Sequence, residues 1–110
     1  MKSALVVSWT MPKAGHERDA IEYGREVDRA WGKAAAEGKC TEPEWYWASR
    51  GHSLWIVRGE MEALLGLMLE LQPLFIKGQI LIDDFEYDIH TYGREEVLAP
   101  YEAVVGQVLV

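Results

Sequence analysis

The sequence predicts an α+β fold, in which helices cover one face of an antiparallel β-sheet. Segments with the two-residue period of strands are separated by Ala-, Glu- and Leu-rich segments that have helical spacing. They follow one another as strand, helix, strand, strand, helix, strand and a terminal helix. With 110 residues, the chain is expected to form a single domain over residues 1–110.

The first strand is predicted from Ser3 to Met11, where apolar and β-branched side chains occupy both faces. Pro12 and Gly15 end this strand. From Glu17 to Gly38 the composition changes to Ala, Glu, Arg and Lys, with apolar or small residues gathered on one helical face. This pattern predicts an amphipathic helix that Gly38 terminates.

A hairpin of two strands is predicted from Glu44 to Glu60, folded around a link at Arg50-Gly51-His52. It carries Trp45 and Trp47 on its first strand and Trp55 on its second. A three-residue link places all three tryptophans on one face, whereas a two-residue link places Trp55 opposite the other two. The sequence leaves both registers open.

The second helix is predicted from Glu60 to Gln72, and Pro73 is expected to end it. Its polar positions recur every four residues and form one narrow stripe, while leucines and a methionine cover the remaining surface. We therefore expect this helix to be buried on more than one side.

The last strand is predicted from Gln79 to Tyr92, because apolar side chains there alternate with acidic ones and with His90. The alternation places the acidic side chains in a solvated row and lacks the loop and glycine of a calcium site. After Gly93, the tail is predicted to form a short helix, with Pro100 in its first turns or at a kink.

This order of elements is the split βαβ arrangement of ferredoxin-like domains, with a four-stranded antiparallel sheet and both main helices on one face. The other face of the sheet still carries aromatic and aliphatic side chains, which a single layer of helices cannot cover. We therefore expect a partner on that face.

Four local signatures accompany the order of elements. They are the connection at residues 12–17, the strand end at residues 56–60, the segment at residues 84–87, and Gly93 together with Tyr101 in the tail. With these features the chain resembles the dimeric α+β barrel superfamily, and most of all its small uncharacterised bacterial members. The resemblance implies that two ferredoxin-like subunits pack their open sheet faces together, as a homodimer or a higher homo-oligomer.

The superfamily that the chain resembles includes cofactor-independent monooxygenases of antibiotic biosynthesis, haem-degrading enzymes, muconolactone isomerases and dehydratases. A shared fold does not choose among such activities. No catalytic motif of any one branch is matched residue by residue, so the resemblance contributes the fold and the dimer.

The amino-acid composition limits the classes of binding partner that we expect. Eighteen Asp and Glu against eleven Lys and Arg give a net charge of −7, which disfavours nucleic acid and anionic membrane surfaces. Cys40 is the single cysteine, so no intrachain disulfide forms. The amino-terminal sequence lacks the pattern of a secretory signal, and no apolar run reaches the roughly 20 residues of a membrane span. A cytoplasmic protein is expected.

Tryptophans on the predicted strands are the candidates for a ligand pocket, since each supplies a large flat apolar surface and one N–H donor. Core and dimer packing is the more common explanation for such residues, since aromatic side chains dominate ordinary cores. The candidate pocket residues are Trp9, Trp45, Trp47, Trp55 and Tyr87.

Histidines are the candidates for proton transfer, because their ordinary pKa lies near neutrality. His16 precedes the first helix, His52 occupies the hairpin link and His90 lies in the last strand. Their spacing matches no metal site, and no axial ligand for haem can be assigned, so no metal or cofactor is expected. His16 and His90 are the candidate catalytic residues.

The leading functional hypothesis is a homodimer that binds a small apolar or aromatic molecule between sheet and helices. In its catalytic form it is a cofactor-independent monooxygenase-like or isomerase-like enzyme. The alternative is a non-catalytic homo-oligomeric assembly or accessory protein, whose aromatic residues are consumed by subunit contacts. The sequence does not decide whether the protein is an enzyme.

Overall fold

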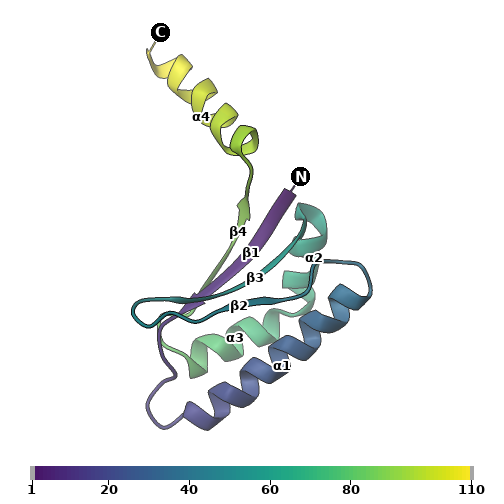
Figure 1. Cartoon of the computed structure of the whole chain (residues 1–110), viewed down its shortest axis with the longest axis vertical. Coiled ribbons are helices and arrows are strands. Elements are labelled where there is room, and N and C mark those ends of the chain that lie inside the picture. Colours follow the sequence, from purple (N-terminus) through teal and green to yellow (C-terminus); the bar gives the residue numbers. More distant parts are fainter. Residues whose placement is uncertain (1, 110) are drawn as a thin grey trace.

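The computed structural model describes residues 2–109 and has the predicted ferredoxin-like α+β architecture (Figure 1). Its strands form one antiparallel sheet in the order β2-β3-β1-β4. The elements are β1 (Lys2–Trp9), α1 (Glu17–Ala36), β2 (Glu44–Tyr46), β3 (Ser53–Glu60), α2 (Met61–Glu70), α3 (Gln72–Leu81), β4 (Glu86–Thr91) and α4 (Arg94–Leu109).

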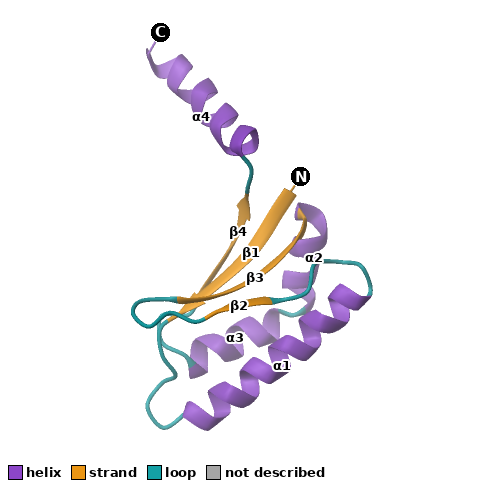
Figure 2. Cartoon of the chain, viewed as in Figure 1, coloured by secondary structure: helices purple, strands orange, loops and turns teal. Residues whose placement is uncertain are grey.

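Strand alternation decides which side chains meet the helices. Leu5 and Val7 of β1 lie beside Val57 and Trp55 of β3 in the antiparallel pairing, and all four side chains are buried. Helices α1, α2 and α3 lie on this face of the sheet (Figure 2). The buried core therefore sits between the odd-numbered strand residues and the helices.

The opposite face of the sheet is uncovered by any described helix (Figure 2). Its centre is apolar, with Val6 paired to Ile56 and with Leu54 nearby, each partly exposed. Towards β4 it becomes polar, because exposed Asp88 and His90 point to this face. The prediction of an open, partly apolar sheet face is confirmed.

Helix α1 matches the predicted amphipathic segment. Its buried residues recur on one stripe, which includes Tyr23, Val27 and Trp31. Beyond its last turn, Gly38 adopts a φ of +78°, the left-handed conformation that glycine accepts without steric cost.

The helical segment after β3 is longer than predicted. Pro73 does not end it: the chain bends by 67° between α2 and α3, and Pro73 lies in the first turn of α3. Proline is tolerated there because the first amide groups of a helix lack an intrahelical acceptor. Consequently Gln79 to Leu81 are helical, and the strand that was predicted from Gln79 begins at Glu86.

Helix α2 is buried on one side, against the prediction. Leu64 and Leu67 are buried, whereas Leu65 is 47% exposed and Leu69 is 75% exposed. The bend after α2 explains this result, because α3 continues along the sheet instead of covering the outer surface of α2 (Figure 1).

No single helix among residues 2–109 is both long and apolar enough to cross a membrane. The bent pair formed by α2 and α3 meets that length and composition test together.

The hairpin has a longer connection than either predicted link. Strand pairing ends at Tyr46 opposite Leu54, so residues 47–52 form the loop. Trp45 lies directly opposite Trp55 and the two share a face. Trp47 has the same strand parity, but it lies beyond the paired residues and is 84% exposed.

Helix α4 projects away from the sheet and the other helices (Figure 1). Pro100 lies inside it, and its side chains from residue 94 to residue 108 are exposed. The exposed set includes large apolar residues spaced along one helical stripe, namely Val97, Leu98, Tyr101, Val104, Val105 and Val108.

Candidate functional site

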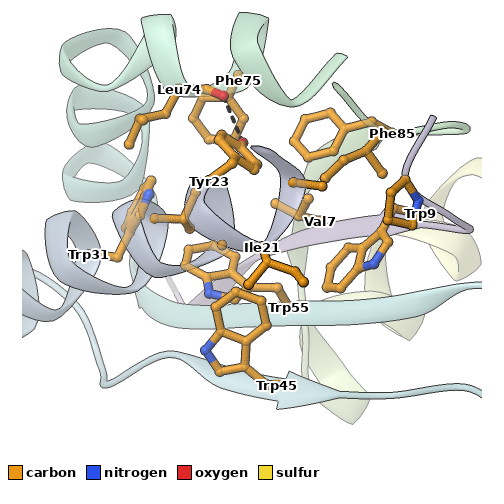
Figure 3. Close-up of a pocket in the computed structure, with 15 residues that line it drawn as sticks. Val7, Trp9, Ile21, Tyr23, Trp31, Trp45, Trp55, Leu74, Phe75 and Phe85 are labelled. Atoms are coloured by element: carbon orange, nitrogen blue, oxygen red, sulfur yellow. Dashed lines mark hydrogen bonds between the residues drawn. The ribbon is translucent and has the colours of Figure 1, made fainter. Parts of the chain in front are cut away.

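An apolar cavity of about 260 Å³ lies between the sheet and helices α1 and α3 (Figure 3). The strands supply its floor and the helices supply its opposite wall. The lining residues are Val7, Trp9, Pro12, Ala20, Ile21, Tyr23, Gly24, Val27, Trp31, Trp45, Trp55, Leu74, Phe75, Ile82 and Phe85. We call this space the aromatic cavity.

Ring contacts run continuously around the aromatic cavity, with centroid separations between 4.4 and 6.3 Å. Five of these seven contacts are edge-to-face, an arrangement that the quadrupole of an aromatic ring favours, and two are tilted. In order of contact the rings are Trp9, Trp45, Trp55, Trp31, Phe75, Tyr87, Phe85 and Tyr23. Such a wall presents flat faces and edges to a bound molecule.

The hydroxyl group of Tyr23 is held inside the wall. It donates a hydrogen bond of 2.7 Å to the backbone oxygen of Leu74 in α3. Burial raises the pKa of Tyr23 above its ordinary value, and the negative charge of Glu26 raises it further. Tyr23 is therefore a neutral group near pH 7 and serves to join α1 to α3.

Two indole groups of the wall differ in their hydrogen bonding. Nε1 of Trp45 donates to Oδ1 of Asp28 at 3.0 Å, and this bond is exposed to solvent. Nε1 of Trp55 is buried and has no hydrogen-bond partner within residues 2–109. Among residues 2–109, Trp55 therefore supplies the fully buried side-chain donor that has no partner.

The cavity lining contains no Asp, Glu, His, Lys, Arg or Cys among the described residues. A charged ligand would lose its hydration there without gaining a partner of opposite charge, which is strongly unfavourable. The lining therefore favours neutral and mainly apolar molecules.

Gly78 of α3 allows the close approach that closes one end of the cavity. A Cβ atom at this position would lie 2.5 Å from Cζ of Phe85 and 2.6 Å from the hydroxyl oxygen of Tyr23. Real Cβ contacts are longer than this, so any side chain at residue 78 displaces one of these rings. Gly78 thereby permits both rings to reach the lining.

The predicted pocket residues are distributed unevenly. Trp9, Trp45 and Trp55 line the aromatic cavity. Tyr87 lies behind the lining, with its ring centroid 4.4 Å from that of Phe75. Trp47 lies in the exposed hairpin loop and is not one of the lining residues.

The candidate catalytic histidines lie outside the aromatic cavity. His16 is an exposed residue at the start of α1, with Nδ1 3.7 Å from Oδ2 of Asp19. His90 is exposed on the open sheet face, where Val6, Ser8, Asp88 and His90 line a shallow polar depression. The structure therefore places neither imidazole against the cavity lining.

His52 is exposed in the hairpin loop. The pKa of Cys40 is raised by burial and by the charge of Glu42, which opposes formation of a reactive thiolate. Within residues 2–109, no group of three His, Cys, Asp or Glu side chains lies close enough together to hold a metal ion.

Sequence reasoning missed the helical half of the lining. Tyr23 and Trp31 lie on the apolar stripe of α1, which looked like ordinary core. Phe75 lies in α3 and Phe85 in the turn before β4, a region that was predicted without a helix. The aromatic side chains at helical spacing on α1 were the available signal for this half of the lining.

Comparison with solved structures supports the fold. No protein-family model matches the sequence, and no curated protein matches it. Among solved structures, the chain is similar to the crystal structure of MupZ from Pseudomonas fluorescens, with a TM-score of 0.57 and 15% sequence identity. The alignment covers 97% of this chain and 84% of the MupZ chain. At this identity the likeness shows the fold alone.

Proposed function

We propose that the protein binds a small, neutral, largely apolar organic molecule in the aromatic cavity. The observation that carries this proposal is a partly open cavity of about 260 Å³ whose wall is largely aromatic and whose described lining has no ionised group. Ligand sites are typically apolar concavities of about 300–1,000 Å³ with few polar groups. The cavity volume lies just below that range, which supports a compact ligand.

Binding of a rigid aromatic probe tests the proposal. Fluorene, a neutral planar hydrocarbon, is titrated against the protein, and binding is followed by calorimetry and tryptophan fluorescence. Ala20 lines the cavity on α1, so Ala20→Leu fills part of the space and is expected to weaken binding at least about ten-fold. Ala36 is exposed at the end of the same helix, so Ala36→Leu is the matched control and leaves affinity unchanged. Absence of saturable binding to the unmodified protein would refute the proposal.

A monooxygenase-like or isomerase-like reaction in this cavity would have no histidine or carboxylate beside the reacting atom. A general acid or base must lie within about 3 Å of the proton it transfers, or one water molecule away. His16 and His90 are exposed outside the lining. We therefore propose binding and positioning as the role of the site. Turnover of a cavity ligand that His16→Ala or His90→Ala abolishes would contradict this assignment.

A homodimer through the open sheet face is the second proposal. It is supported by the uncovered apolar centre of that face, where Ile56 lies between Val6 and Glu44 on the neighbouring strands. The proposal is compatible with ligand binding, because the aromatic cavity is on the other side of the sheet. It also accommodates a non-catalytic accessory role.

Sedimentation velocity distinguishes the dimer from a monomer. Ile56→Glu introduces a charge at the centre of the open face and is expected to produce monomers. Leu69→Glu changes an exposed residue of α2 and leaves the dimer intact. A monomeric unmodified protein at micromolar concentration would overturn the proposal.

A further inference from the structure

The indole N–H of Trp55 is the starting point for naming the ligand class. Trp55 is 2% exposed and lines the aromatic cavity, and its Nε1 has no partner among residues 2–109. Buried polar side-chain atoms are usually hydrogen-bonded, to protein or to a bound molecule. An indole N–H donates and cannot accept, so the missing partner is an acceptor.

Two other polar side-chain groups of the wall already have partners. The hydroxyl of Tyr23 donates to the backbone oxygen of Leu74, and the indole of Trp45 donates to Asp28. Neither needs a ligand to complete its hydrogen bonding as a donor. Trp55 therefore supplies the fully buried donor of the described wall with which a bound molecule can form a directional contact.

Trp45 controls access to this donor. Figure 3 shows the nitrogen of Trp55 on the edge of its ring nearest Trp45, and the two ring centroids are 6.3 Å apart. Trp45 is 46% exposed, and its indole nitrogen is bonded to Asp28 at the surface. An acceptor that reaches Nε1 of Trp55 has to displace this outer, half-exposed ring.

We propose that the ligand carries a carbonyl oxygen, which accepts a hydrogen bond from Nε1 of Trp55 while its planar apolar body fills the aromatic cavity. This inference rests on the proposed function. The body is apolar because the remaining lining is aromatic and aliphatic, and it is uncharged because the described lining supplies no counter-charge. The ligand class is thus a neutral aromatic ketone or quinone.

A matched pair of probes isolates the carbonyl group. Fluorene and 9-fluorenone have nearly the same tricyclic shape and differ by one carbonyl oxygen. The ratio of their dissociation constants is measured for the unmodified protein and for Trp55→Phe, which keeps an aromatic ring and removes the donor. A hydrogen bond of ordinary net strength changes affinity roughly five-fold. We expect the preference for fluorenone to fall about five-fold in Trp55→Phe.

Trp31→Phe is the comparison variant, because Trp31 is also buried in the cavity wall and its ring centroid lies 5.2 Å from that of Trp55. This variant removes the same ring volume and a different indole N–H, so the preference for fluorenone is expected to fall less than in Trp55→Phe. An equal fall in both variants would overturn the assignment to Trp55. An unchanged ratio in Trp55→Phe, with both probes still bound, would overturn the inference and leave the proposed function standing. Failure of the unmodified protein to bind either probe would refute both.

A measurement on the unmodified protein covers the case in which Trp55→Phe does not fold. The five tryptophans give separate indole N–H signals in a nitrogen-15 correlation spectrum. Fluorenone is expected to move one buried indole proton downfield, whereas fluorene is not. Equal shifts with both probes would overturn the assignment.

Discussion

Replacing Gly78 by alanine tests how tightly the end of the aromatic cavity is packed. The added Cβ atom would lie 2.5 Å from Phe85 and 2.6 Å from the Tyr23 hydroxyl. Overpacking of this kind costs about 1–3 kcal/mol, and loss of the Tyr23 hydrogen bond costs about 1 kcal/mol more. Alanine recovers about 1 kcal/mol, because it is a better helix former than glycine. The expected net loss is about 1–3 kcal/mol of unfolding free energy.

Urea denaturation followed by fluorescence measures this loss, and a thermal midpoint lower by roughly 4–8 °C per kcal/mol is expected alongside it. Gly66 supplies the control, because it lies inside α2 and a Cβ atom there would meet nothing within 4 Å. Gly66→Ala is expected to raise stability by up to about 1 kcal/mol. If Gly78→Ala were as stable as the unmodified protein, this result would contradict the close packing of Phe85 and Tyr23 against α3.

Two further predictions concern the core. The pKa of Tyr23 is raised in the folded state, so the unfolded chain loses the phenol proton at a lower pH than the folded protein does. The contribution of this group to the free energy of unfolding is therefore fully present below about pH 10 and falls as the pH rises further. Denaturation at pH 9 and pH 11 should show a smaller alkaline loss in Tyr23→Phe, and an equal loss in both proteins would contradict the burial of the phenol. Leu64→Ala removes a fully buried side chain and should cost about 2–5 kcal/mol, whereas Leu65→Ala on the exposed side of α2 should stay within about 0.5 kcal/mol. Similar urea midpoints for these two leucine variants would show that α2 packs differently.

The topology was predictable because the strand segments could be recognised by their two-residue period. Leu5 and Val7 in β1 and Val57 in β3 follow the two-residue period, and the structure buries them on the helix side. The order of strands and helices along the chain then leaves few ways to form an antiparallel sheet. Gly38 marks the end of α1 for a local reason, its positive φ.

The region from Pro73 to Leu81 was not predictable by the same reasoning. It contains an apolar run with no clear period, and proline is compatible with either the end of one helix or the first turn of the next. The local sequence does not show whether the helix ends at Pro73 or bends and continues. In the folded chain, Phe75 of the continued helix packs against Trp31, and this contact joins residues far apart in the sequence.

The cavity was only partly visible in the sequence for a related reason. Trp45 and Trp55 belong to paired strands, so their parity relates them to each other. Trp31 reaches the same space from a helix, and its position depends on how α1 settles on the sheet. Alternation along a strand did not predict the position of Trp47, because strand pairing stops before this residue.

The sheet separates two chemical environments that lie one residue apart along each strand. Ile89 faces the helices, while its neighbours Asp88 and His90 face the open side. A carboxylate placed at Val7, which lines the cavity floor, would enter a poorly hydrated site and acquire a raised pKa. One substitution of the correct parity would thus install a proton acceptor beside a bound molecule, which makes this scaffold a short evolutionary step away from acid–base catalysis.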